Sequence, residues 1–115
     1  MMPNLKPSEP LSQVVFIHDY FQLIFQDERF NIYNVSEVEH HGIKVVQSQP
    51  GFCDALVALI GQRVVKASRS NSHVLQLSFE EGAQFVVRSD DEAVRGPEAF
   101  QFNGKNQPTV VEQNA

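Results

Sequence analysis

Acidic residues gather in a polar stretch near the C-terminal end of the chain. Asp90, Asp91 and Glu92 are consecutive, and Arg95 and Glu98 follow in RGPEAFQFNG. Two carboxylates that face each other across a cleft can hydrolyse glycosides, but nothing in the sequence sets such a distance. Long loops in compact domains tend to be functional, so these five residues are the candidate binding residues. The alternative is that the loop simply covers an open sheet edge.

Two adjacent histidines, His40 and His41, follow Glu37 and Glu39. A metal site needs about three such ligands that converge on one ion. Neighbouring residues of a strand point to opposite faces, so the two histidines could share an ion only within a loop. The pair is therefore an alternative metal site, and the sequence itself implies no cofactor.

No stretch of the sequence carries a strong catalytic signature. The patterns GxGxxG, HExxH, CxxC and GxSxG and the phosphate-binding loop do not occur. The single cysteine, Cys53, lies in the apolar segment GFCDALVALI, which predicts a buried thiol. These observations favour a protein that is not an enzyme.

The overall composition is typical of one globular domain with a modest core. The chain has 115 residues, of which 42% are apolar and 20% charged, and its net charge is −5. An acidic chain argues against binding to nucleic acid or to an anionic membrane. The first ten residues, MMPNLKPSEP, lack the apolar core of a signal peptide, and the run Ala55–Ile60 is too short to span a bilayer. A cytoplasmic protein is expected.

The elements that would position these residues are mostly strands. Residues 1–11, with three prolines, are predicted to be a flexible N-terminal tail, and residues 12–115 a single domain. Residues 52–60 have apolar side chains at helical spacing and predict a short helix that ends before Gly61. Alternating or β-branched apolar residues predict strands in these ranges: 13–17, 20–25, 30–35, 43–47, 62–67, 74–79, 84–88 and 109–111. The polar stretches between these ranges are interpreted as connections.

The regions before and after the helix resemble each other. Residues 13–47 and 62–112 match in the order of their elements, with FQLIFQDERFNIY corresponding to LQLSFEEGAQFVV and IKVVQ to PTVVE. The sequence thus predicts a mainly β (α+β) fold of two related antiparallel β-meander halves with one central short helix. The halves would pack face to face or extend into one curved sheet, and the short last strand could pair across a homodimer.

Four segments together resemble a family of small bacterial domains of unknown function. They are ALIGQRVVKAS, LQLSFEEGAQFVV, RGPEAFQF and PTVVE, within residues 55–112, with a less clear match over 14–47. The resemblance implies a β-hairpin domain that acts like an immunity protein, which binds and neutralises a toxin. It implies no catalytic residues.

Three functional hypotheses follow. The first is a non-enzymatic module that binds another protein, with an immunity-like role as one form of it. The second is a small-molecule or metal-binding domain, or an enzyme, in which His40, His41 and the 90–92 loop lie near one another. The third is a homodimeric structural protein.

Overall fold

The fold consists almost entirely of short antiparallel strands. The computed structural model describes residues 4–70 and 73–114, and these contain ten strands, one α-helix and one 3-10 turn. The elements are β1 (Gln13–Phe16), β2 (Phe21–Phe25), β3 (Glu28–Ile32), β4 (Ser36–His40), β5 (Ile43–Val46), α1 (Phe52–Val57), β6 (Val64–Ser68), β7 (His73–Phe79), β8 (Gln84–Arg88), η1 (Asp91–Ala93), β9 (Glu98–Asn103) and β10 (Val110–Gln113). Within these ranges no helix is long and apolar enough to cross a membrane.

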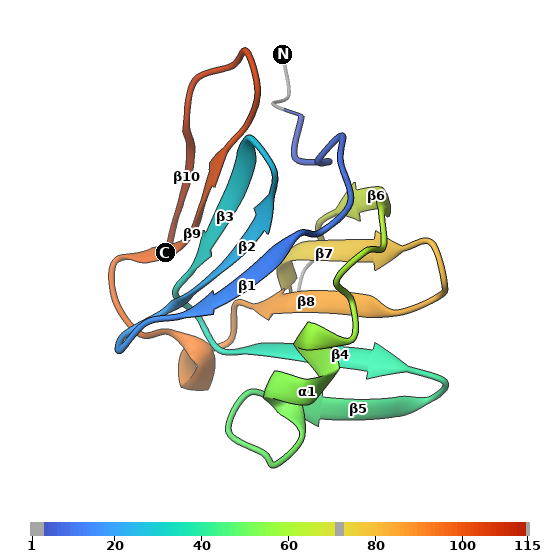
Figure 1. Cartoon of the computed structure of the whole chain (residues 1–115). Helices are drawn as coiled ribbons and strands as arrows, with labels where there is room; N and C mark the ends of the chain where they lie inside the picture. Colours follow the sequence, from blue (N-terminus) through green and yellow to red (C-terminus); the bar gives the residue numbers. More distant parts are fainter. Residues whose placement is uncertain (1–3, 71–72, 115) are drawn as a thin grey trace.

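The strands form two five-stranded sheets (Figure 1). One sheet has the order β1-β2-β3-β9-β10 and the other the order β5-β4-β8-β7-β6, and every neighbouring pair is antiparallel. The mainly β fold with one short helix that the sequence predicts is therefore confirmed.

The two halves of the chain exchange strands between the sheets. Strands β1–β3 lie in one sheet and β4–β5 in the other, whereas β6–β8 join β4–β5 and β9–β10 join β1–β3. If five is added to the numbers of β1–β3 and subtracted from those of β9 and β10, the first sheet becomes 6-7-8-4-5, which is the order of the second sheet counted from its other edge. The prediction that each half would pack as its own unit is therefore wrong. The third and fourth strands of each half belong to different sheets, so each sheet contains strands of both halves.

The core lies between the sheets and contains most of the phenylalanines. Inward-facing residues alternate along β2 and along β7, in the same pattern and with almost no exposed surface. These residues are Phe21, Leu23 and Phe25 in β2 and Leu75, Leu77 and Phe79 in β7. The segments that match in sequence therefore also match in which side chains they bury.

The polar stretch 36–42 is a hairpin arm rather than a connection. Ser36 and Val38 of β4 are buried, while Glu39 lies opposite Lys44 of β5 on the outer face. The turn that follows has positive φ at two positions, 55° at His41 and 79° at Gly42, as tight hairpins require. Sequence reasoning missed β4 because its outward residues are charged.

The helix is shorter than predicted and its cysteine is exposed. α1 covers Phe52–Val57 and packs against β1, β4 and β5, with Phe52 and Leu56 buried. Cys53 was expected to be buried, but it is exposed. Each helical residue is rotated by about 100° from the one before, so Cys53 points away from the face that Phe52 buries.

Residues 4–11 follow the body of the protein instead of leaving it as a free tail (Figure 1). Leu11 exchanges backbone hydrogen bonds with Gly61 and Gln62. The carboxylate of Glu28, which is 5% exposed, accepts hydrogen bonds from the Ser8 N–H at 2.8 Å and from its hydroxyl at 2.7 Å. These bonds anchor a segment that its prolines keep from forming a helix.

Candidate functional site

The candidate binding residues lie in and beside the connection from β8 to β9. This connection spans residues 89–97, whereas the equivalent connection from β3 to β4 spans only residues 33–35. The extra residues form the 3-10 turn η1, in which Asp91 and Glu92 are exposed. The connection is therefore where the two halves differ most.

The carboxylate of Asp90 is paired with a side chain of the protein itself, that of Arg88. The carboxylate accepts hydrogen bonds from Arg88 Nε at 2.8 Å and from Arg88 Nη2 at 2.6 Å. This bidentate contact holds the pKa of Asp90 below its ordinary value. The pair fixes the start of the connection and leaves less charge on Asp90 for a ligand.

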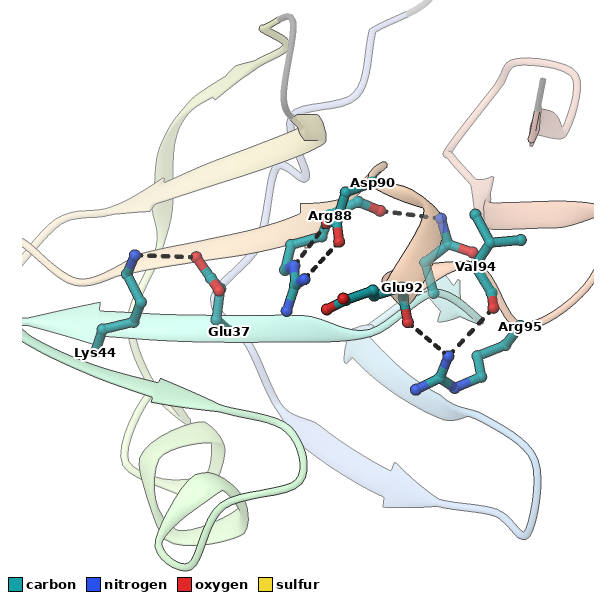
Figure 2. Close-up of polar contacts among 8 residues, drawn as sticks. Glu37, Lys44, Arg88, Asp90, Glu92, Val94 and Arg95 are labelled. Atoms are coloured by element: carbon teal, nitrogen blue, oxygen red, sulfur yellow. Dashed lines mark hydrogen bonds and ion pairs between the residues drawn. The ribbon is translucent and has the colours of Figure 1, made fainter.

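Arg95 is held by backbone oxygens rather than by a carboxylate. Its Nη1 donates to the carbonyl oxygens of Glu92 at 2.8 Å and Val94 at 3.2 Å (Figure 2). No ion pair of Arg95 occurs among residues 4–70 and 73–114. The guanidinium is thus oriented by its own turn while its other N–H groups can meet a ligand.

Three hollows meet at Arg95, with volumes of about 540, 430 and 260 Å³. The largest reaches the connection between β1 and β2, the second reaches Arg88 and Glu92, and the smallest reaches Glu98. We call the combined surface the Arg95 groove, and it is lined by residues 16–21, Tyr33, Val35, 46–48, Arg88, Glu92 and 95–98. Of the five candidate residues, Glu92, Arg95 and Glu98 line it.

Aromatic and aliphatic side chains form one wall of the groove. Phe16 is 48% exposed and Ile17 41% exposed, and the ring of Tyr20 lies 5.4 Å from that of Tyr33. Burial and the nearby charge of Glu98 raise the pKa of Tyr33. Sequence reasoning assigned these residues to strand ends and turns. Their signal is the large apolar residues that flank the polar His18-Asp19 turn on both sides in FIHDYF.

A pair of amide side chains, Asn34 and Asn114, holds the 89–97 connection beside the groove. Asn34 has no exposed surface, and its Nδ2 donates to the Arg88 carbonyl and to Asn114 Oδ1, each at 2.9 Å. Asn114 Nδ2 donates back to Asn34 Oδ1 at 3.0 Å and also to the Gly96 carbonyl at 2.8 Å. Both ends of the 89–97 connection are therefore tied to the same pair.

The histidines lie at the opposite end of the second sheet from this connection. Ser36, at the start of β4, pairs with Val87, whereas His40 ends the strand and its Nε2 lies 3.2 Å from the Glu81 carbonyl oxygen. The rings of His40 and His41 stack at 3.9 Å. The hypothesis that they share a site with the 90–92 loop is therefore wrong, since the length of β4 separates them. The described residues contain no group of three His, Cys, Asp or Glu side chains that could hold a metal ion.

Comparisons with protein-family models, with curated proteins and with solved structures found no match to this chain. The Arg95 groove is therefore interpreted from its own geometry and chemistry.

Proposed function

We propose that this protein is a non-enzymatic binding module whose Arg95 groove receives a segment of another protein. The observation that carries the proposal is the long 89–97 connection, which places Arg95 against half-exposed aromatic side chains at the point where the two halves differ. Tyrosine, phenylalanine and arginine are enriched in protein interfaces, where a few such residues supply most of the binding energy.

The charges of the groove favour a basic partner segment. Asp19, Glu92 and Glu98 line it, and Arg88 is neutralised by Asp90, which leaves Arg95 as its remaining cation. A partner with lysine or arginine side chains beside an aromatic anchor would complement both the acidic rim and the apolar wall.

Hydrogen bonds order the 89–97 connection before any partner binds. The Asn34–Asn114 pair holds the connection, and Arg95 donates to two carbonyl oxygens. A preorganised surface loses less conformational entropy on binding, which supports recognition rather than a mobile catalytic loop. An immunity-like role, in which the partner is a basic toxin, is one form of this proposal.

Selection from a random peptide library on the immobilised protein tests the proposal. We expect the selected peptides to combine lysine or arginine with aromatic residues. Their binding to the Asp19→Lys/Glu98→Lys double variant should be at least about tenfold weaker. The control, Asp27→Lys/Glu81→Lys, makes the same charge change in exposed turns at the other end of the sheets. Equal loss of binding in both variants, or selection without basic residues, would contradict the proposal.

Two further predictions concern the chain itself. The correspondence of strand order and of buried positions supports a duplication of a half-length unit. Self-association stays a prediction, with β10 at a sheet edge and Val111 39% exposed on it. Light scattering coupled to gel filtration measures the molar mass in solution, and a monomer at all concentrations would contradict a homodimer.

A further inference from the structure

A separate hollow lies on the side of the molecule formed by β6 and the N-terminal segment. It has a volume of about 620 Å³ and is lined by residues 4–6 and 65–69. Leu5, Val65 and Ala67 contribute apolar surface, and Val65 is 56% exposed. We call it the β6 hollow. Apolar surface of this kind beside an edge strand is a common place for a peptide to bind.

The outer side of β6 is unpaired from the register shift between Val64 and Lys66 onward, so residues 66–68 offer the regular part of this edge. Among the described strands, β6 is the last of its sheet and pairs only with β7. Among the described residues, the backbone hydrogen bonds outside regular elements include none between residues 4–10 and Val64–Ser68, and the nearest joins Leu11 to Gln62. The N–H and C=O groups on the outer side of β6 therefore lack a strand partner.

The charge of the β6 hollow is opposite to that of the whole protein. Lys6, Lys66 and Arg69 line it, and no carboxylate does within residues 4–70 and 73–114, although the chain has a net charge of −5. Arg69 reaches Glu112 of β10 at 2.9 Å, which leaves Lys6 and Lys66 as the free cations of the lining. A ligand that complements this surface is extended and acidic.

We propose that β6 is a docking edge for an extended acidic segment of another protein, which adds to the sheet as a further strand. Backbone hydrogen bonds to the outer side of β6 supply affinity, and alternating side chains supply specificity. Val65 and Lys66 are both exposed at the register shift of β6, whereas Ala67 pairs with the buried Leu77 on the core side. Acidic side chains of the ligand therefore face Lys6 and Lys66 beside Val65, and its alternate side chains lie on the side of Ala67. This surface is separate from the Arg95 groove, so either proposal can fail without the other.

The test uses an acetylated and amidated peptide of about eight residues that alternates glutamate with valine. Calorimetry should detect binding of this peptide, and binding to the Lys6→Glu/Lys66→Glu variant should be at least about tenfold weaker. Arg29→Glu/Lys44→Glu, which reverses two charges on β3 and β5 outside the hollow, is the matched control and should bind as the unaltered protein does. A peptide that alternates lysine with valine should not bind.

Backbone pairing is tested by N-methylation of alternate amides of the same peptide. Methylation of the set that faces β6 should abolish binding, and methylation of the other set should leave it intact, because only one edge of an added strand pairs. Amide exchange of β6 should slow in the complex. The proposal is overturned if the peptide does not bind, if both methylated forms bind alike, or if an oligothymidine competes without slowing exchange in β6, which would indicate charge attraction alone.

Discussion

Replacing Asn34 with alanine removes an amide that ties down the 89–97 connection, which carries Arg95. Its side chain takes part in three hydrogen bonds, to the Arg88 carbonyl and in both directions to Asn114. Each hydrogen bond contributes about 0.5–1.5 kcal/mol net to stability. The Asn34 side chain that makes the three bonds is fully buried. We expect the free energy of unfolding to fall by about 3 kcal/mol.

Thermal or urea unfolding followed by circular dichroism measures this change. With about 2.1 cal/mol/K of unfolding entropy per residue, a chain of 115 residues has about 0.24 kcal/mol/K. A loss of about 3 kcal/mol therefore lowers the melting temperature by about 12 °C. Asn114→Ala should cost a similar amount, because it breaks the same two bonds to Asn34 and the bond to the Gly96 carbonyl, and leaves the fully buried Asn34 amide without that partner.

The double variant separates a true amide pair from two independent effects. The two single changes should together cost more than the double change, by about 1 kcal/mol or more, because each single variant already breaks the same two hydrogen bonds. Additive effects, or an Asn34→Ala loss below about 0.5 kcal/mol, would refute the argument that this pair holds the 89–97 connection.

Three further predictions concern the sheets and their anchors. Burial raises the pKa of Glu28, but hydrogen bonds from Ser8 and Lys105 outweigh it, so the pKa lies below the ordinary value of 4.5. The stability that Glu28 contributes is then fully present above that value and is lost as pH falls through the lower folded-state pKa. Glu28→Gln should therefore make the unfolding free energy depend less on pH in the acid range. An unchanged pH dependence would contradict this prediction. Gln26 has a φ of 62° in the β2–β3 turn, so Gln26→Gly should raise the unfolding free energy by about 0.5 kcal/mol in urea titration, whereas a decrease would show that the turn is unstrained. A protease site inserted between Ser48 and Gln49 should, after cleavage, leave the two fragments together in gel filtration, because each sheet contains strands of both halves. Their separation without denaturant would contradict the strand exchange.

The sequence predicts the strands best where a strand buries one face. Phe21, Leu23 and Phe25 alternate, and they lie as expected on the inner side of β2. The same rule failed at 36–40, since Glu37 and Glu39 are polar and only Ser36 and Val38 point inward. A short strand with a serine at one inward position gives too weak a period to recognise.

The strand exchange and the groove could not be predicted from local patterns. Nothing in the 33–35 or 89–97 connections indicates that each crosses to the other sheet. The crossing depends on strand pairing between the two halves, of β9 with β3 and of β4 with β8, which local sequence does not specify. Arg95 and Glu98 were predicted from the length of their loop, but Phe16, Tyr20 and Tyr33 come from elsewhere in the chain and reach the groove only through that exchange.

The central claim is that the Arg95 groove is the protein-binding surface. Titration of the isotope-labelled protein with a peptide selected from the library, followed by NMR amide shifts, tests it most directly. We expect the largest shifts in residues 16–21, at Tyr33 and in residues 95–98, with little change around His40–Gly42 at the far end of the sheets. Shifts centred on another face, with the groove residues unchanged, would contradict the claim.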